Sequence, residues 1–285
     1  MISVIVPLYK GGKYIPSIIE NVYQMMKYLK SKKPTEEVEL IFVNDYPEEV
    51  IDKITKKEMK ITFLFHAANS GIHQARISGL EAAKGEYVLF LDQDDYVEED
   101  FLYSQLEAIK NSDVVVSNGF RDFGNYKKKL YKYSFTRKLI SIPFFYIYGT
   151  DMIFSPGQCL IKSNSIPVDW KNHVMKTSGC DDYFLWILML NCNCQITTNF
   201  TANYYHRETQ KNYSNSRDRM LASLEEMIEI LRHFSYIEER SINILHKRLE
   251  IKKAQDKSRK ELIKKLLQNP AICAAALLYK LCGYY

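Results

Sequence analysis

The stretch GEYVLFLDQDDYVEED, residues 85–100, runs from an apolar segment directly into a group of aspartates. Residues 87–91 read as a buried strand, and Asp92, Asp94 and Asp95 follow it at once. Carboxylates this close repel one another unless a positive charge lies between them. A solvated loop with a helix start at Asp95 would explain only one of them. A divalent cation such as Mg²⁺ or Mn²⁺, which favours hard oxygen ligands, would explain the whole group.

The composition around this stretch is that of a globular protein, 46% hydrophobic and 26% charged over 285 residues. Residues 1–15 lack the basic leader of a signal peptide, and no apolar run approaches the ~20 residues that span a bilayer. The six cysteines include no C-x-x-C pair, so we expect reduced thiols and a cytoplasmic protein.

The net charge of +5 is concentrated near the C-terminal end of the sequence. Residues 240–265 contain ten Lys or Arg and three Asp or Glu, which leaves the remainder slightly acidic. A nucleic-acid-binding surface spread over the fold is therefore not expected, and no such motif is present.

Strand and helix patterns alternate through the first 118 residues. The expected strands are 2–8, 38–45, 60–67, 86–92 and 112–118, and the expected helices lie within 11–33, 50–60, 71–85 and 101–109. This alternation predicts an α/β fold with a mostly parallel, doubly wound sheet. Ligands bind such sheets at the carboxyl ends of the strands, where residues 7–9, Asp45 and Asp92 lie. These residues outline a nucleotide-sized crevice.

The alternation stops at about residue 119, so the expected divisions of the chain are 1–118, 119–215 and 216–285. The middle part begins with a polar, antiparallel ribbon in residues 120–135. Further expected features are a Pro-Gly turn before a short apolar run in residues 153–166, a helix after the aspartates at 181 and 182, an amphipathic helix over 216–235, one or two basic helices over 238–268, and an apolar end.

Four segments together resemble the family 2 glycosyltransferases of the GT-A fold. They are ISVIVPLYKGGKYI (2–15), VELIFVND (38–45), NSGIHQARISGLEAAKGEYVLFLDQDD (69–95) and GCDDYFLW (179–186). The resemblance is clearest over residues 1–118 and looser over 150–215. It implies a GT-A-type sheet and an inverting, Mn²⁺- or Mg²⁺-dependent transfer of sugar from a UDP-sugar. The implied acceptor is a hydroxyl of a glycan or lipid-linked molecule in cell-surface polysaccharide assembly.

The resemblance also implies roles for residues around the donor. The residues that it assigns to nucleotide binding are Pro7, Tyr9, Asp45, Arg76 and Asp92. Asp45 would accept a hydrogen bond from the base, and Asp92 would lie near the ribose. The family pattern after this strand is Asp-Asp-Gly-Ser, whereas this chain has Asn-Asp-Tyr-Pro. Without the resemblance, Asp45 suits a turn and Arg76 an exposed helix cation.

The metal and diphosphate roles fall on two segments. Asp94 would bind the metal that bridges to the diphosphate, and Asp95 would support the metal shell or the acceptor side. His206 would be a further metal ligand or a phosphate donor, and Arg207 a phosphate clamp. A metal neutralises the charge that develops on a departing nucleoside diphosphate.

The acceptor side is implied by the pair Asp181 and Asp182. We expect Asp182 to act as general base, kept ionised by the helix start, and Asp181 to steer the acceptor. Capping of the helix alone is the alternative. Gln158 is expected to contact the acceptor hydroxyl, and Trp170 is a candidate for stacking on a sugar.

The basic, apolar end of the chain has two interpretations. One is a peripheral membrane anchor on the inner face of the cell membrane, with Ile272, residues 274–278, Tyr279 and Leu281 partly inserted. The other is a helix that docks on the core or on a second copy of the chain in a homodimer. Two other functions stay open: a sugar-phosphate nucleotidyltransferase using the basic, glycine-containing LYKGGKY segment, and a non-catalytic sugar-nucleotide-binding protein.

Overall fold

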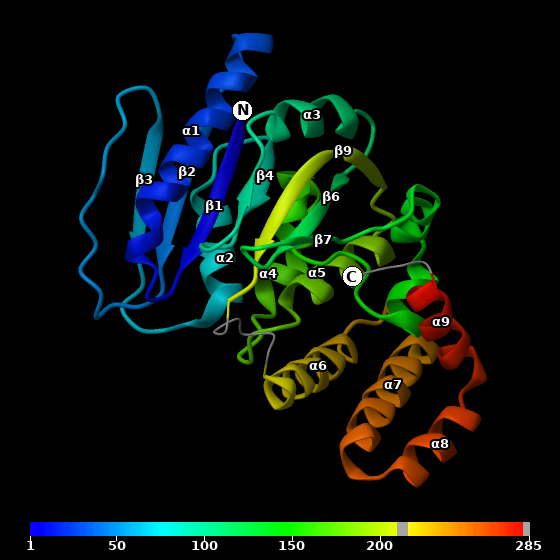
Figure 1. Ribbon diagram of the computed structural model, residues 1–285. Helices are drawn as coiled ribbons and strands as arrows, with labels where there is room; N and C mark the ends of the chain where they lie inside the picture. Colours follow the sequence, from blue (N-terminus) through cyan, green and yellow to red (C-terminus); the bar gives the residue numbers. More distant parts are fainter. Residues whose placement is uncertain (210–215, 282–285) are drawn as a thin grey trace.

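The computed structural model describes residues 1–209 and 216–281 (Figure 1). Its strands are β1 (Ile2–Leu8), β2 (Val38–Asn44), β3 (Lys60–Phe65), β4 (Tyr87–Phe90), β5 (Tyr96–Val97), β6 (Val114–Asp122), β7 (Lys127–Lys129), β8 (Cys159–Lys162) and β9 (Ile196–Arg207). Its α-helices are α1 (Ile15–Lys32), α2 (Gly71–Ala82), α3 (Phe101–Ile109), α4 (Val168–Asn172), α5 (Asp181–Asn191), α6 (Arg217–Leu231), α7 (Glu239–Lys257), α8 (Arg259–Leu267) and α9 (Pro270–Leu281). Shorter helical turns are η1 (Gly12–Tyr14), η2 (Ser134–Ser141), η3 (Phe145–Gly149), η4 (Pro156–Gln158) and η5 (Ser163–Ser165).

The strands form one mixed sheet in the order β3-β2-β1-β4-β8-β6-β9-β5, with β7 paired to β6. Parallel pairing joins β1 to both β2 and β4, and β2 to β3. Because β8 is antiparallel to both β4 and β6, β6 runs in the direction of β4. The predicted α/β fold with a mostly parallel sheet is confirmed. The predicted polar ribbon is the β6–β7 hairpin, in which Phe120 pairs with Lys129.

Helices cover both faces of the parallel part of the sheet. The crossover through α1 leads from β1 outward to β2, and the crossover through α2 leads from β3 back to β4. Right-handed crossovers in opposite directions place α1 and α2 on opposite faces. A Cβ on Gly79 of α2 would lie 2.3 Å from Ile5 Cγ2, so this glycine allows α2 to approach β1 closely.

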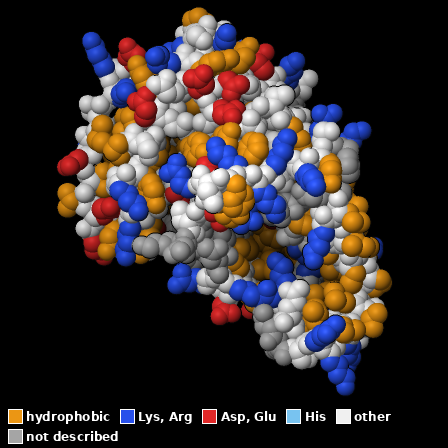
Figure 2. Space-filling view, viewed as in Figure 1, with side chains coloured by type: hydrophobic (Ala, Val, Ile, Leu, Met, Phe, Trp, Pro, Cys, Tyr) orange, Lys and Arg blue, Asp and Glu red, His pale blue; other side chains and the backbone are white. Residues whose placement is uncertain are grey.

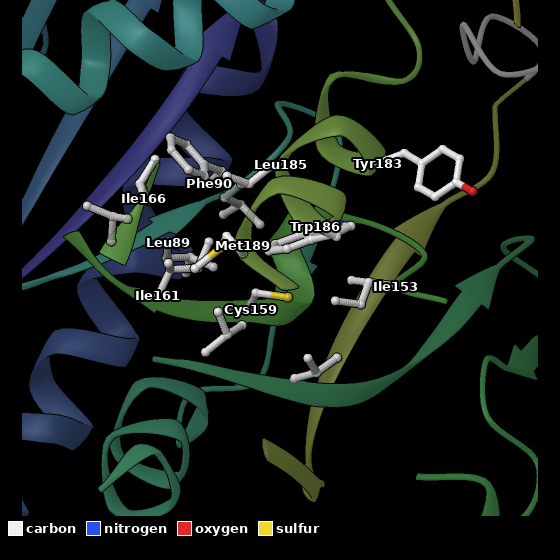
Figure 3. Packing of buried hydrophobic residues seen from close by; sticks show 14 of the residues in the cluster. Leu89, Phe90, Ile153, Cys159, Ile161, Ile166, Tyr183, Leu185, Trp186 and Met189 are labelled. Atoms are coloured by element: carbon white, nitrogen blue, oxygen red, sulfur yellow. The ribbon is translucent and has the colours of Figure 1, made fainter. Parts of the chain in front are cut away.

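Apolar side chains of α5 pack against the middle of the sheet (Figure 3). Leu185, Trp186 and Met189 lie over Leu89 of β4 and Ile161 of β8, and all are buried. This packing fixes the start of α5 beside the carboxyl end of β4, because a buried apolar face cannot rotate without opening a cavity.

One expectation about local structure was wrong, and one long strand was not predicted. Residues 51–59 are not helical, because this lysine-rich stretch has no apolar stripe to bury: Val50 is 93% exposed and only Met59 is buried. Strand β9 was not predicted, because asparagine and threonine interrupt its apolar alternation. β9 pairs in parallel with β6, with a register shift between Ser117 and Asn118 that bends the strand.

The predicted helices of the C-terminal region form the lower part of the molecule in Figure 1. Ser223 Oγ of α6 accepts a hydrogen bond from Cys180 N at 3.0 Å, and Glu226 accepts one from Lys176 N at 2.6 Å. Arg248 of α7 donates to Tyr146 O at 2.8 Å. These bonds attach α6 and α7 to the segments that precede and contact α5.

The final helix corrects part of the membrane prediction. Ile272 and Ala275 of α9 are buried, whereas Leu277, Leu278 and Leu281 are exposed. The cysteines in the described part of the chain are all free thiols. None of the helices in residues 1–209 and 216–281 combines the length and apolarity needed to cross a membrane.

Candidate active site

A cavity of about 1260 Å³ opens at the carboxyl ends of β1, β2 and β4. Pro7 and Tyr9 line it at the end of β1, Asp45 after β2, and Asp92 and Asp94 after β4. The start of α5 and parts of α6 and α7 form the remaining wall. Strand direction therefore brings together residues that the sequence placed at separate strand ends.

Asp45 is buried at the base of the cavity and bound by protein donors. Its carboxylate accepts hydrogen bonds from Ser70 N and Gly71 N, both at 2.8 Å, and its Oδ1 lies 2.7 Å from His66 Nδ1. Gly71 has a φ of +86°, which favours glycine and lets two successive N–H groups point to one carboxylate. Since a carboxylate offers about four acceptor positions, one remains for a ligand in the cavity.

Arg76 is buried and joins two walls of the cavity. It donates to Asp92 Oδ1 at 2.7 Å and to Asp181 Oδ2 at 2.5 Å. These carboxylates raise the pKa of the guanidinium although burial opposes them. Arg76 lines the cavity, so the alternative of an exposed helix cation is wrong.

Asp95 is buried in a network at the end of β9. It accepts hydrogen bonds from the Tyr204 hydroxyl and from Arg207 N, the latter at 3.0 Å, and its carboxylate lies 3.2 Å from His206 Nδ1. Burial lowers the pKa of His206, but the hydrogen bond and charge of Asp95, together with the charges of Asp92 and Glu208, outweigh it and raise the pKa to about 9. The helix-start alternative for Asp95 is wrong, because α3 begins only at Phe101.

Asp94 lines the cavity, and no cation of the described residues lies within ion-pair distance of it. Burial and then the charges of Asp95 and Asp92 raise its pKa to about 6. In the described residues, no group of three or more His, Cys, Asp or Glu is arranged to hold a metal. One or two carboxylates still fit Mg²⁺ or Mn²⁺, because such ions keep several waters and complete their shell with substrate phosphates. Asp94 is the carboxylate that would bind the ion.

Asp181 and Asp182 begin α5, as predicted. Both line the cavity: Asp181 is buried against Arg76, and Asp182 is less buried and accepts a hydrogen bond from Tyr183 N at 2.7 Å. Burial, and then the charge of Asp181, raise the pKa of Asp182 to about 7. The Tyr183 N–H at the helix start does lower this pKa, as expected, but burial and the charge of Asp181 outweigh it. A carboxylate with this pKa suits proton transfer near neutral pH.

Three predicted ligand contacts do not lie in the cavity. Gln158 is fully buried, where its Oε1 accepts from Phe154 N at 3.0 Å and its Nε2 donates to a backbone oxygen of β6. The structure thus makes Gln158 a support of η4 rather than an acceptor contact. Trp170 is also fully buried and donates to the Asp181 backbone oxygen at 2.8 Å. The guanidinium of Arg207 lies over the Tyr96 ring, 5.2 Å from its centroid, and its phosphate role stays a prediction. Residues 210–215 of the basic segment after β9 lie outside the described residues.

The sequence patterns missed several cavity residues from distant segments. Asp151 lies in the loop after η3, Lys176 lies before α5, and Arg217 and Lys252 lie on α6 and α7. One signal was available for Lys252, which falls one turn after Arg248 on the buried stripe of α7. A charged side chain at a position where the helix pattern calls for an apolar one indicates that its charged end contacts a polar group or solvent.

Comparison with solved structures identifies the fold. TarS 1–349 of S. aureus, in complex with UDP-GlcNAc, is similar to 93% of this chain and 79% of that chain, with a TM-score of 0.61 and 17% identity. The mannosyltransferase PcManGT of Pyrobaculum calidifontis, in complex with GDP-Man and Mn²⁺, is similar over 100% of this chain and 76% of that chain, with a TM-score of 0.58 and 16% identity. These likenesses confirm the predicted GT-A fold.

Sequence comparison identifies the family. GlyG of Streptococcus pneumoniae, a glycosyltransferase, is 32% identical over 125 residues, which is 41% of this chain and 38% of the relative. TuaG of Bacillus subtilis, a putative teichuronic acid biosynthesis glycosyltransferase, is 33% identical over 111 residues, 38% of this chain and 41% of the relative. The match thus spans less than half of each relative. The sequence pattern of glycosyl transferase family 2 matches residues 3–166, more than half of this chain. The chain belongs to glycosyl transferase family 2.

Proposed function

We propose that the protein transfers a sugar, with inversion, from a UDP-sugar to a hydroxyl of a glycan or lipid-linked acceptor. The observation that carries this proposal is the placement of Asp94 and Asp182 on one cavity, each beside a buried aspartate bound by protein donors. Asp94 is suited to bind a cation that neutralises the leaving diphosphate. Asp182 is suited to accept the proton of the attacking hydroxyl.

The proposed reaction is an in-line displacement. Asp182 accepts the proton of the acceptor hydroxyl, whose oxygen forms a bond to the anomeric carbon. The bond from that carbon to the diphosphate oxygen breaks, and its electron pair leaves with the nucleoside diphosphate. Mn²⁺ or Mg²⁺ bound at Asp94 would neutralise the charge on the leaving group. Arg76 keeps the two walls of the cavity together through Asp92 and Asp181.

Three similar proteins support the choice of substrates. The TarS structure contains UDP-GlcNAc and the PcManGT structure contains Mn²⁺, which supports a nucleotide-sugar donor and a divalent ion here. The name of TuaG refers to teichuronic acid biosynthesis, which supports assembly of a cell-envelope polysaccharide.

Calorimetric titration of UDP, GDP and ADP, each with and without Mn²⁺, tests the proposal. We expect selective, Mn²⁺-dependent binding of UDP that Asp94→Ala abolishes. Asp52→Ala is the matched control, because Asp52 is exposed in the loop before β3 and does not line the cavity. Binding of UDP that is indifferent to both Mn²⁺ and Asp94 would refute the metal assignment.

We also propose that α8 and α9 contact an anionic membrane surface. Ile263, Leu267, Leu277 and Leu281 are exposed, and Leu267 is 78% exposed. Figure 2 shows hydrophobic side chains gathered over the C-terminal helices, with Lys and Arg beside them. Exposed apolar side chains among cations suit the interface of an anionic bilayer.

Sedimentation with lipid vesicles tests this contact. We expect binding to vesicles containing anionic lipid, weakened by salt and by Leu267→Ser, and little binding to neutral vesicles. Val50→Ser is the control, because Val50 is exposed on a different part of the chain. A stable dimer in solution that buries Leu267 would instead assign this surface to a second copy of the chain.

A further inference from the structure

Asp45 is held by a histidine that has no part in the proposed reaction. The last residue of β2, Asn44, pairs with the last residue of β3, Phe65, so Asp45 and His66 follow side by side at the β3 edge of the sheet (Figure 1). The His66 backbone N–H donates to Asn44 O at 2.9 Å, which continues the pairing by one residue. The register of two parallel strands therefore places the imidazole beside the Asp45 carboxylate.

The imidazole of His66 links Asp45 to α2. Its Nδ1 lies 2.7 Å from Asp45 Oδ1, and its Nε2 lies 2.9 Å from Ser78 Oγ. Gln74 Nε2 donates to the same Ser78 oxygen at 3.4 Å. Because a carboxylate only accepts hydrogen bonds, Nδ1 is the nitrogen that carries a proton and donates. Nε2 then accepts from the Ser78 hydroxyl, so each side chain from Gln74 to Asp45 donates to the next one.

The hydrogen bonds are divided unequally between the two oxygens of Asp45. Among the described residues, Oδ1 accepts from His66 Nδ1 and Ser70 N, whereas Oδ2 accepts from Gly71 N at 2.8 Å. A carboxylate oxygen offers about two acceptor positions, so Oδ1 is filled and the position left for a ligand lies on Oδ2. Three donors from two segments also leave the carboxylate little freedom to turn. The free position suits a ligand N–H group and opposes a ligand lone pair.

We propose that His66, supported by Ser78 and Gln74, is a positioning residue for recognition of the nucleobase. Of these four described residues, Asp45 lines the cavity and the other three do not, so His66 acts through Asp45. Uracil presents an N3–H group to the free position, whereas cytosine presents a lone pair on the same ring atom. By fixing which carboxylate oxygen faces the cavity, His66 makes the site select bases with a ring N–H. This inference rests on the proposed function, because it takes a UDP-sugar as the sugar donor.

Calorimetric titration of UDP and CDP at saturating Mn²⁺ tests the role of His66. The unmodified chain should bind UDP about 100-fold more tightly than CDP, because CDP leaves the buried carboxylate without a partner. His66→Phe should reduce this ratio about tenfold, because it removes one donor and lets the carboxylate turn. His66→Asn keeps a side-chain N–H close to Asp45 and should retain most of the ratio. His233→Phe is the matched control, because His233 is exposed between α6 and α7, and it should leave the ratio unchanged.

The ratio separates positioning from support of the fold. An equal loss of UDP and CDP affinity in His66→Phe would show that His66 only supports the fold, and would overturn the proposal. Equal affinity of the unmodified chain for UDP and CDP would overturn it as well. If the unmodified chain bound no UDP at all, the proposed function would be refuted, and positioning for uracil with it.

The imidazole proton gives a second readout that requires no nucleotide. Long-range proton–nitrogen correlation spectra of the isotopically labelled, ligand-free chain report which ring nitrogen is protonated, and the His66→Asn spectrum assigns the signals. We expect a proton on His66 Nδ1. A spectrum in which this nitrogen carries no proton would overturn the proposal, whether or not UDP binds.

Discussion

Two pairs of neighbouring aspartates border the cavity, Asp94–Asp95 in the loop after β4 and Asp181–Asp182 at the start of α5. In each pair one carboxylate is buried and bound by protein donors, and the other is less buried and lines the cavity. The buried members are Asp95 and Asp181, of which Asp181 also borders the cavity, and the less buried members are Asp94 and Asp182. Burial, and then the charge of the buried member, raise the pKa of the neighbouring carboxyl in each pair.

The partners of the buried members make the two pairs different. Asp181 binds the guanidinium of Arg76, whereas Asp95 binds the Tyr204 hydroxyl, a backbone N–H and His206, which is a cation near neutral pH because its pKa is about 9. Arg76 is shared with Asp92, and Asp94 has no cation of the described residues within ion-pair distance. Two aspartate pairs that look alike in sequence can therefore be suited to different functions, metal binding in one pair and proton transfer in the other.

The largest effect is expected for Asp182→Asn. If Asp182 is the base, the transfer rate should fall by about 10²–10⁴-fold while UDP binding is retained, because the amide cannot accept the proton. Rates of UDP release with acceptor present, together with calorimetry, measure both quantities. Asp52→Asn should leave both unchanged. Near-normal transfer by Asp182→Asn would show that Asp182 is not the base and that the two pairs do not differ in function as proposed.

Arg76→Met should lower the free energy of unfolding by about 3–5 kcal/mol, because it leaves Asp181 as a buried charge without its partner. Denaturant titration measures this difference. Arg232→Met removes a surface pair with Glu229 and should cost less than about 1 kcal/mol. Adding Asp181→Asn to Arg76→Met should recover part of the loss, and no recovery would show that the buried charge is not the cause.

The pH dependence of the transfer rate tests whether Asp182, in the pair Asp181–Asp182, is the base. A base must be deprotonated, and the pKa of Asp182 is about 7, so the rate should rise with pH and level off above about 7. Below that pKa the rate should change about tenfold per pH unit. Measurement of kcat between pH 5 and 9 at saturating Mn²⁺ and substrates tests this. A flat profile over this range would exclude Asp182 as the titrating base.

A smaller effect is expected for Asp94→Asn on stability in metal-free buffer. The folded-state pKa of Asp94, about 6, exceeds the ordinary value of 3.8, so its stabilising contribution is present below about pH 4 and is lost as the pH rises through 6. The variant should therefore be more stable than the unmodified chain by about 1–3 kcal/mol at pH 8 and nearly equal to it at pH 4. Denaturant titration at both pH values, with a chelator present, measures this. A difference that does not change with pH would contradict the charge repulsion in the first pair.

The fold of the first half was predictable because its signals are local. The apolar positions of α1 that have helical spacing are all buried, and the aspartates at 45 and 92 follow strands whose direction the alternation predicts. The aspartates at 181 and 182 begin α5, as the apolar run after them indicates. Each of these predictions depends on residues within a few turns of one another.

Long-range contacts were not predictable in the same way. Gln158 and Trp170 have residue types suited to binding sugars, and both are buried supports instead. Asp181 resembles its neighbour in sequence, yet its partner Arg76 is 105 residues away. Lys252 lines the cavity, although it belongs to a lysine-rich region in which Lys247, Lys260 and Lys264 are exposed.

The amino-acid sequence was sufficient to predict the family, the parallel strands and helices α1, α2 and α3 of the first half, and the carboxylates at the strand ends. Folding in three dimensions was needed to settle which of these carboxylates receives a partner and which faces the cavity. The physical reason is that a strand or helix pattern arises from periodic burial along the chain. The charge state of a buried group depends instead on the few donors, cations and carboxylates that packing places around it, whatever their distance in sequence.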